Sequence, residues 1–383
     1  MYDVIVVGGG PAGSKSARLL SRDHDVMVLE DHNCSGEPVE CTGLISPDVI
    51  RESGIKPDIL NSFSNLCAVF PDGRKVTVRC KDEKAVVIDR ADFDRKMADK
   101  AIDAGAKYVY SKRCTSCSVQ NDSVSVFSDN DRYDGKVLIG ADGHTSTVRQ
   151  QLFIQRPEMY VRGIQADVEF TYEYQDTIDI FLGSDVAPDF FAWAIPFDDR
   201  VRVGLCCGWD NELPAFYFKK LLQKLKMDDS KVIMKNSGKI PLGTLSKTYR
   251  DRVLLVGDSA GQVKPISGGG LNPGLVSAGH AADVIHEAFQ SEDFSEKMLK
   301  QYQQRWKSSV GKELKSGLRL RKMYNNLSDS DLNSVGAIVD DRKILDPISE
   351  VTLDSVSDAV PIVMKNLPVA FKLLPYMIKG VIR

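Results

Sequence analysis

The chain opens with a short apolar run that leads directly into glycines. Tyr2–Val7 is rich in β-branched residues and predicts a buried strand. Gly8–Gly13 is a candidate turn, Ser14–Ser21 predicts a helix, and Val26–Leu29 predicts a second buried strand that leads into Glu30. The succession of strand, glycine turn, helix and strand is typical of a βαβ unit with parallel strands.

Two later segments repeat the passage from an apolar strand into a glycine turn. Val137–Ala141 leads into Asp142 and Gly143, and Arg252–Val256 leads into Gly257 and Asp258. The second turn is followed by three consecutive glycines, Gly268–Gly270, and then by a long helical pattern. We assign both segments to the same domain as the first βαβ unit.

The rest of the chain has other patterns. Leu66–Arg79 and Tyr160–Trp209 are strand-like and predict an antiparallel sheet, whereas Leu213–Lys226 has the apolar spacing of a helix. From Glu292 onward the pattern is helical. Together these elements predict an α/β fold, with a Rossmann-like dinucleotide-binding domain, an antiparallel-sheet domain for the substrate and a C-terminal helical region.

The predicted domains are interleaved along the chain. The dinucleotide-binding domain takes residues 1–65, 84–150 and 250–290, and the sheet domain takes residues 66–83 and 151–249. The helical region takes residues 291–383.

The first glycine turn has the residues that a dinucleotide needs. Gly8 permits the tight turn, Gly10 lets a pyrophosphate approach the backbone, and Gly13 lets the helix pack closely on the strand. The helix N-terminus then directs free N–H groups at the phosphates. Glu30 follows 22 residues after Gly8, where a carboxylate accepts hydrogen bonds from ribose hydroxyls and disfavours a 2′-phosphate. These features leave FAD or NAD as the ligand.

The later segments favour FAD over NAD. Asp258, at the end of a buried strand, can reach the ribityl hydroxyls of a flavin. Gly268–Gly270 opens a helix and offers backbone N–H groups where a reduced isoalloxazine carries negative charge. An NAD enzyme needs no second glycine-rich helix start so far along the chain, so we expect a bound FAD.

Composition limits the partners and the location of the protein. The 383 residues include 50 basic and 53 acidic side chains, a net charge of -3, which gives no basic surface for nucleic acid. No stretch approaches the roughly 20 apolar residues of a membrane-spanning helix, and the first apolar run lacks the basic flank of a signal peptide. We expect a cytoplasmic protein and leave contact with a membrane surface open.

The eight cysteines do not predict a metal site. Cys114-x-x-Cys117 has the spacing of a redox or zinc pair, but no second pair or histidine cluster completes it. Both residues, like the adjacent Cys206 and Cys207, lie in strand-like stretches. We interpret these thiols as reduced core residues.

With these motifs in view, the sequence resembles the glutathione-reductase-type flavoproteins that include p-hydroxybenzoate hydroxylase. More closely it resembles the geranylgeranyl reductase family, and within it the archaeal digeranylgeranylglycerophospholipid reductases, over roughly the first three-quarters of the chain. The residues that carry the resemblance, and that it assigns to flavin binding, are Gly8, Gly10, Ala12, Gly13, Glu30, Cys41, Thr42, Gly43, Arg90, Asp258, Gly270 and Leu271.

A further motif resembles the segment that faces the substrate in this family. Pro188–Pro196 fits the pattern P-x-x-Y-x-W-x-F-P, except that Phe191 replaces the usual tyrosine and Ile195 the usual phenylalanine. The resemblance implies that Phe191, Trp193 and Pro196 contact substrate. For Trp193 a role as a core aromatic of the sheet is an equal alternative.

The resemblance implies an FAD-dependent oxidoreductase that saturates the double bonds of geranylgeranyl chains in archaeal membrane lipids. Such an alkene must receive a hydride and a proton, and Cys41 is the candidate acid; its alternative is a packed thiol that only shapes the pocket. No second G-x-G-x-x-G appears, so we expect electrons from ferredoxin or from NAD(P)H bound transiently. The rival functions are a flavin-dependent aromatic monooxygenase and a non-catalytic prenyl-binding protein.

The end of the chain repeats a seven-residue unit that starts at Pro361, Pro368 and Pro375. Each unit carries one lysine, Lys365, Lys372 or Lys379, and no acidic residue follows Asp358. A spacing of seven returns to nearly the same helix face, so the lysines would align beside an apolar surface. The alternatives are a membrane-surface element and helices that are broken at the prolines and pack on the rest of the protein.

Overall fold

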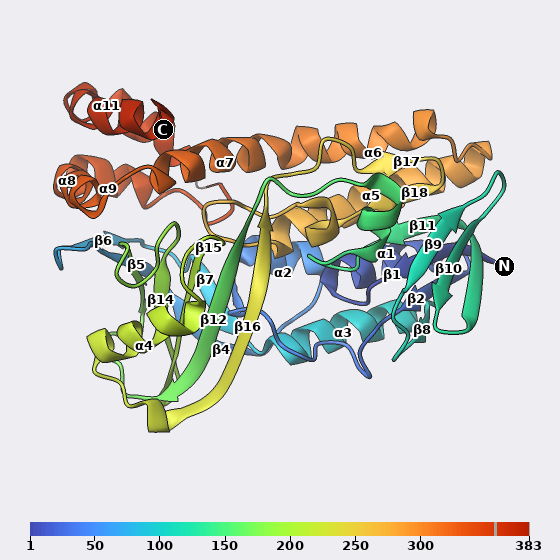
Figure 1. The fold of residues 1–383 in the computed structure, drawn as a ribbon, viewed down its shortest axis with the longest axis horizontal. Coiled ribbons are helices and arrows are strands. Elements are labelled where there is room, and N and C mark those ends of the chain that lie inside the picture. The colour runs from blue at the N-terminus through green and yellow to red at the C-terminus, as the bar shows by residue number, and fades with distance from the viewer. Residues whose placement is uncertain (356–357, 383) are drawn as a thin grey trace.

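The computed structural model describes residues 1–355 and 358–382. The two ends of the chain lie toward opposite ends of the elongated molecule, the N-terminus beside the first sheet and the C-terminus among a cluster of helices (Figure 1). A second sheet lies beneath those helices (Figure 1).

The first sheet has eight strands, and the first strand of the chain lies in its interior. The order of the main path is β17-β18-β11-β1-β2-β8, with β10 and β9 attached to β11. Neighbouring pairs from β18 to β8 are parallel, and β17, β10 and β9 pair in the antiparallel sense. The strands are β1 (Tyr2–Val7), β2 (Val26–Leu29), β8 (Lys107–Val109), β9 (Ser116–Val119), β10 (Val124–Ser128), β11 (Asp131–Gly140), β17 (Tyr249–Arg250) and β18 (Val253–Leu255).

Strand β1 is buried on both faces. Val4 and Val6 belong to one apolar cluster with residues of α1 (Pro11–Leu20) and α5 (Leu271–Ser291), and Ile5 and Val7 belong to another. Because alternate residues of a strand point to opposite faces, a strand covered on both sides is apolar throughout. The predicted strands at both ends of the βαβ unit are confirmed. The helix begins at Pro11, ahead of the predicted start, since proline suits the first turn of a helix.

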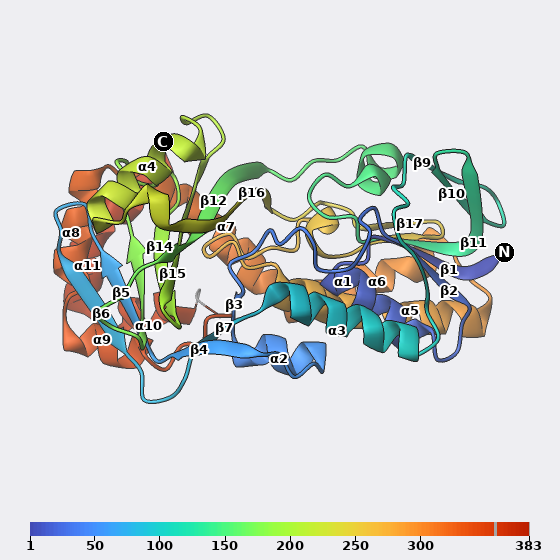
Figure 2. The ribbon, with the colours of Figure 1, turned by 90° about the horizontal axis from the view of Figure 1, so that it is seen from below.

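A small sheet and two helices adjoin this domain. The sheet has the order β3-β7-β4, and helices α2 and α3 lie beside it on the underside of the molecule (Figure 2). Asp89 caps α3 by accepting a hydrogen bond from the Asp92 N–H, which begins the helix at Arg90. The elements are β3 (Leu44–Ile45), α2 (Pro47–Ser53), β4 (Ile59–Phe63), β7 (Ala85–Ile88) and α3 (Arg90–Asp103).

The second large sheet has seven strands in the order β16-β12-β15-β14-β13-β5-β6. Its pairs are antiparallel, as predicted, except that β5 and β13 run parallel. Strand β16 lies outside the predicted stretches and forms one edge of the sheet. The elements are β5 (Asn65–Val69), β6 (Lys75–Arg79), β12 (Met159–Glu169), β13 (Thr177–Phe181), β14 (Ala192–Phe197), β15 (Arg200–Gly208), α4 (Pro214–Leu225) and β16 (Val232–Leu242). Helix α4 confirms the helix predicted over this interval.

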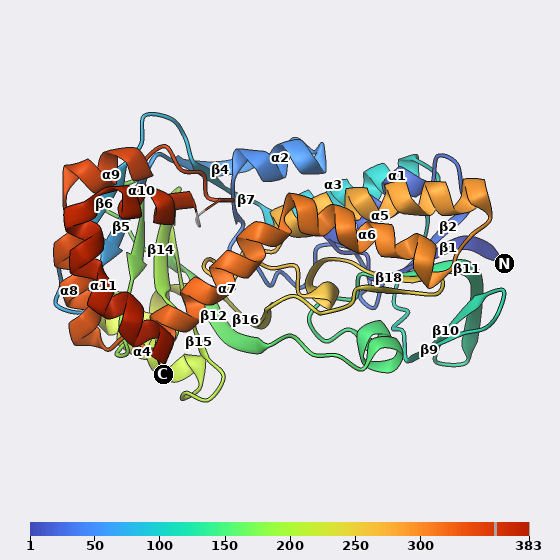
Figure 3. The same cartoon turned by 90° about the horizontal axis from the view of Figure 1, so that it is seen from above.

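The C-terminal helices bridge the two large sheets. Helix α7 runs from the nucleotide-binding side toward the seven-stranded sheet, where α8 to α11 gather (Figure 3). Gly336 of α8 lies against the ring of Phe70, and Leu332 packs in the same apolar cluster. The helices are α6 (Glu296–Ser309), α7 (Gly311–Asn325), α8 (Asp329–Val339), α9 (Arg342–Ile348), α10 (Ala359–Lys365) and α11 (Leu367–Ile382).

The prolines near the C-terminus do not all end helices. Pro368 lies at the start of α11, where its missing N–H needs no partner, but Pro375 lies inside α11. Among the described residues, no helix is long and apolar enough to cross a membrane.

Candidate active site

One cavity of about 990 Å³ joins the glycine turns of the first sheet to the inner face of the seven-stranded sheet. The elements that border it come from all three predicted domains, from Val7 near the N-terminus to Asp354 in the C-terminal region. Its nucleotide end, at the glycine turns, is polar, and the part beneath the seven-stranded sheet is lined by apolar side chains such as Ile178, Ile180 and Trp193.

The first glycine turn is shaped for close approach of a ligand. Gly8 has a φ of +101°, and a Cβ at this position would lie 2.3 Å from the carbonyl oxygen of Ala141. A Cβ at Gly10 would meet no atom within 4 Å, so this glycine faces open space at the N-terminus of α1. The arrangement leaves backbone N–H groups and the positive end of the helix dipole available to a pyrophosphate.

Glu30 closes the nucleotide end of the cavity. Its carboxylate accepts hydrogen bonds from the N–H of Gly9 at 2.6 Å and from the N–H of His32 at 3.1 Å. Burial raises the pKa of Glu30. Glu30, Asp31 and His32 also bring three candidate metal-ligand atoms within 4.8 Å of one another, at the same end of the cavity.

Asp258 lies where the other glycine turns meet. It follows β18 in a short 3₁₀ turn, Gly257–Ala260, and a Cβ at Gly270 would lie 2.8 Å from its Oδ1 atom. Burial raises the pKa of Asp258 to about 6, although the Arg90 charge acts in the opposite direction. A buried carboxylate of this kind gains stability when a bound group donates hydrogen bonds to it.

Cys41 lies beside the Arg90 guanidinium. Arg90 donates to Asp94 through Nε at 3.2 Å and through Nη2 at 2.9 Å. Burial would lower the pKa of Arg90, but the Asp94 carboxylate and the Cys41 side chain raise it above its ordinary value. The thiol therefore lies beside a guanidinium whose charge is paired with the Asp94 carboxylate.

The aromatic motif contributes one face of the apolar compartment. The Phe191 ring stacks on Phe190 with centroids 4.6 Å apart and meets Trp193 edge-on at 6.1 Å. Gly204 on the neighbouring strand makes room for the indole, because a Cβ there would lie 2.5 Å from the Trp193 ring. Pro196 is three residues from Trp193 along β14 and points to the opposite face of the sheet.

Most of the predicted site residues come together. Those that line the cavity are Gly8, Gly10, Ala12, Glu30, Cys41, Thr42, Arg90, Phe191, Trp193, Asp258, Gly270 and Leu271. Gly13, Gly43 and Pro196 are not among the described residues that line it. Gly13 and Gly43 instead permit close backbone contacts, with Gly8 and Ile88 respectively. Pro196 lies outside the described cavity lining, so the geometry gives no support to its expected contact with substrate.

A charged group that also lines the cavity, Lys264 with Asp354, was not predicted from the sequence. Lys264 donates to the Asp354 carboxylate at 2.6 Å and to the Leu353 carbonyl at 2.9 Å, and Ser46 also donates to Asp354. The Lys264 and Asp354 side chains are only 11% and 7% exposed. A segment of the C-terminal region thus contacts the glycine turn and the start of α2. In the sequence, Lys264 lies four residues before the Gly268–Gly270 run, and this proximity was the local signal for a charged residue at the cavity.

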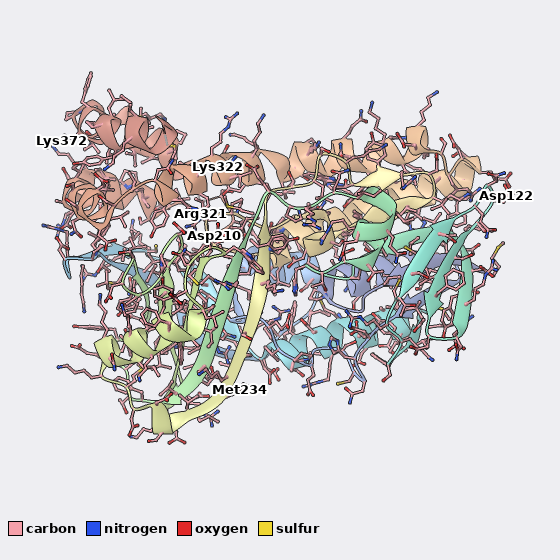
Figure 4. The ribbon with its side chains drawn as sticks, in the orientation of Figure 1. Asp122, Asp210, Met234, Arg321, Lys322 and Lys372 are labelled. Carbon is pink, nitrogen blue, oxygen red and sulfur yellow. The ribbon has the colours of Figure 1, made fainter. Side chains whose placement is uncertain are left out.

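Arg321 of α7 was also missed. Its guanidinium donates to the carbonyls of Pro265, Ile266 and Asp189, and it lies 4.1 Å from the centroid of the Phe190 ring. Burial lowers the pKa of Arg321 to about 10. Figure 4 shows Arg321 on the side of α7 that faces the seven-stranded sheet. The side chain therefore ties α7 to both the glycine turn and the aromatic motif.

Comparison with known proteins agrees with this geometry. A family model described as an FAD binding domain matches residues 1–314. A digeranylgeranylglycerophospholipid reductase of Methanocaldococcus jannaschii is 30% identical over 354 residues, which cover 88% of this chain and 90% of that protein. The chain belongs to the geranylgeranyl reductase family of FAD-binding proteins.

Two further members extend the likeness to almost the whole chain. An uncharacterized protein of the same organism is 29% identical over 361 residues, 91% of each chain. A solved structure of a geranylgeranyl bacteriochlorophyll reductase-like protein from Thermoplasma acidophilum has a TM-score of 0.85 at 25% identity and covers 98% of this chain and 99% of that chain. The likeness to the reductase family thus includes the C-terminal helices, beyond the three-quarters expected from the motifs.

The residues present fit the cofactor of this family, which is FAD. Gly10 leaves open space at the end of α1, and the cavity continues from this turn past Asp258 to the N-terminus of α5 at Gly270. The first turn suits a pyrophosphate, Asp258 suits the ribityl hydroxyls, and the N–H groups at the start of α5 suit the electron-rich edge of the flavin. These assignments of individual residues remain predictions.

The raised pKa of Asp258 predicts a pH dependence for the protein without FAD. In an unfolded chain an aspartate has a pKa of about 4, against about 6 in the folded protein. The folded state holds this proton more tightly, so the stabilising contribution is complete below about pH 4 and is lost as the pH rises through about 6. Asp258→Asn apoprotein should match wild-type stability near pH 4 and exceed it by about 2–3 kcal/mol at pH 8.

Denaturant unfolding of both apoproteins from pH 4 to pH 8 measures this difference. Parallel stability curves for the two proteins would contradict the burial of an ionised Asp258.

Proposed function

We propose that this protein is an FAD-dependent reductase that saturates the isoprenoid double bonds of geranylgeranyl chains, with digeranylgeranylglycerophospholipids as substrates. The observation that carries the proposal is the continuity of the cavity. A polar nucleotide end opens directly into an apolar compartment, so a flavin bound at Asp258 would face a hydrocarbon chain beneath the seven-stranded sheet. The named reductases in the same family support the choice of substrate.

The reaction adds one hydride and one proton across an isolated alkene. Reduced FAD supplies the hydride when it is bound. The remaining requirement is a compartment that excludes water and aligns the chain, which the side chains of Ile178, Ile180 and Trp193 provide. An isolated alkene has no polar group to anchor it, so shape and apolar contact must orient the double bond.

Cys41 is the side chain that we assign to proton donation. The thiol lies at the junction of the two parts of the cavity, on a segment that borders both. After it gives up its proton, the side chain remains beside the Arg90 guanidinium. Solvent then restores the proton between turnovers.

The aromatic monooxygenase and the non-catalytic prenyl-binding protein are less well supported. Halogenases and other flavoproteins match this fold at 13–20% identity, which indicates shared architecture alone. A prenyl-binding protein would not need an acidic side chain buried between glycine turns, as Asp258 is.

Anaerobic incubation of dithionite-reduced holoenzyme with a digeranylgeranyl phospholipid tests the proposed reaction. The lipid mass should rise in steps of two hydrogens, and in deuterated water in steps of two deuteriums, because dithionite supplies only electrons and both added hydrogens come from solvent. A purified protein that binds FAD but leaves the lipid mass unchanged would overturn the proposed reductase activity. It would leave the identification of FAD as the cofactor intact.

The role of Cys41 is tested by Cys41→Ala in the same assay. We expect turnover to fall by a factor of about 100, within the usual range for loss of a general acid, while FAD binding and reduction by dithionite stay at the wild-type level. Cys34→Ala serves as the matched control, because Cys34 is a similarly half-buried thiol that does not line the cavity. Equal turnover of the two variants would remove Cys41 from the mechanism.

We further propose that α10 and α11 bring the cavity to the membrane surface where such lipids reside. Phe371, Leu374 and Ile378 of α11 share one helix face and are 71%, 43% and 49% exposed. Lys365 and Lys372 are exposed beside them, and Figure 4 shows Lys372 at the outer edge of the molecule. Lys365 departs from the predicted row of lysines, because it lies on α10, whereas Lys372 and Lys379 lie seven residues apart on α11. Lys379 also forms an ion pair with Asp331 of α8. An apolar face bordered by lysines suits an anionic bilayer.

Vesicle flotation tests this contact with the double variant Phe371→Ser/Ile378→Ser. Burial of such a side chain contributes about 1.5–3 kcal/mol, so binding to vesicles of phosphatidylglycerol and phosphatidylcholine should weaken by at least about tenfold. Ile154→Ser is the control, because Ile154 is 85% exposed and lies at the end of the short helix Arg149–Phe153, outside α10 and α11. Equal losses in both variants, or no binding by the wild type, would overturn the proposal.

A further inference from the structure

Residues 39–43, which carry Cys41 and are called the strap below, have no regular secondary structure. In such a segment the backbone carbonyls have no hydrogen-bond partners within a helix or sheet, so they need partners from other parts of the protein. Three carbonyls of the strap accept hydrogen bonds from side chains of the seven-stranded sheet. Asn236 donates to Val39 at 2.6 Å, Gln165 donates to Cys41 at 2.8 Å, and Arg202 donates to Thr42 at 2.6 Å.

The three donors come from neighbouring strands and form one polar group on the sheet. Gln165 of β12 lies opposite Asn236 of β16 in the strand register. Asp167, two residues along β12 and therefore on the same face as Gln165, lies opposite Arg202 of β15. This polar group interrupts an otherwise apolar sheet face at the position where the strap crosses it.

Arg202 is held rigidly in place by Asp167. The guanidinium donates to the carboxylate through Nε at 2.7 Å and through Nη2 at 2.9 Å, and the two side chains are 10% and 7% exposed. A bidentate pair of this kind fixes the plane of the guanidinium. The remaining nitrogen, Nη1, is then directed at the Thr42 carbonyl.

The same part of the sheet also borders the apolar compartment. Gln165 lies opposite Gly204, and Gly204 lies opposite Trp193 on the next strand. A Cβ at Gly204 would lie 2.5 Å from the Trp193 ring and 2.7 Å from the Gln165 Cβ, so the two side chains are packed across this glycine. The side chain of Trp193 is therefore a neighbour of the side chain that holds Cys41.

We propose that Gln165, Arg202 and Asn236 are positioning residues that set the place of the Cys41 thiol between the flavin pocket and the apolar compartment. The sheet that encloses the substrate thus aligns the strap, which belongs to the nucleotide-binding side of the chain. The catalytic consequence rests on the proposed function, because it requires that Cys41 acts on the substrate. The positional consequence, that these three residues fix the place of the Cys41 thiol, does not depend on the proposed function.

The positional consequence is tested on the holoenzyme by the rate at which iodoacetamide alkylates Cys41, followed by peptide mass. Gln165→Leu and Asn236→Leu each remove one donor to the strap and should raise this rate by about tenfold, while the rate at Cys34 stays unchanged. The flavin absorbance maximum should shift in the same variants, since the strap lines the flavin pocket. Asn236 lies on an edge strand, so its variant is expected to fold if Gln165→Leu does not.

Tyr172→Phe is the matched control. It removes the hydrogen bond from Tyr172 to Asp179 at 2.5 Å, which lies in the same sheet domain and away from the cavity lining. We expect this variant to lose stability with no change in Cys41 alkylation or flavin absorbance. If the strap variants behave like Tyr172→Phe, the three residues are structural only and the proposal is overturned.

Steady-state lipid reduction then separates positioning from substrate binding. Gln165→Leu should lower kcat by about tenfold or more and change KM less than about threefold, since the apolar wall is retained. A rise in KM with kcat unchanged would overturn the positioning role. If the wild type reduces no lipid, the proposed function fails, and the alkylation rates still decide whether the sheet positions the strap.

Discussion

The rest of the structure depends on a close backbone contact between the turn at Gly8 and Ala141, the residue that follows β11. A Cβ at Gly8 would lie 2.3 Å from the Ala141 carbonyl, and a Cβ at Gly13 would lie 1.9 Å from the Gly8 carbonyl. Without side chains at these positions, α1 can begin directly beyond β1 and direct its N-terminus into the cavity. The parallel neighbours β11 and β18 end at the same edge, which brings Asp258 to the same cavity.

The cavity combines two environments that ordinarily exclude each other. At the nucleotide end, burial raises the pKa of both Glu30 and Asp258, so these carboxylates carry a desolvation cost that ligand hydroxyls can offset. Beneath the seven-stranded sheet the lining is apolar, and an alkene can be held there without competing water. Arg90 and Cys41 lie between the nucleotide end and the apolar part of the cavity. There the Arg90 charge is paired with Asp94 and the apolar part stays shielded from water.

The C-terminal helices complete the cavity from outside both sheets. Arg321 of α7 holds the glycine turn and the aromatic motif together, and Asp354 joins Lys264 to Ser46. These buried contacts are charged, and a buried charge is tolerated only where partners surround it. The helical region is thus part of the site, and its outer helix α11 presents exposed apolar residues on the opposite side.

The sequence by itself determined the local elements and the nucleotide-binding chemistry. Strand β1, the turn at Gly8 and the acid Glu30 follow from residues adjacent in the chain, because steric and hydrophobic preferences act over a few residues. Only the tertiary structure decided which side chains share the cavity. The pairing of β16 with β12, the ion pair of Lys264 with Asp354 and the hydrogen bond from Gln165 to the Cys41 carbonyl all join segments far apart in sequence. Such contacts are set by strand register and packing, which no local pattern encodes.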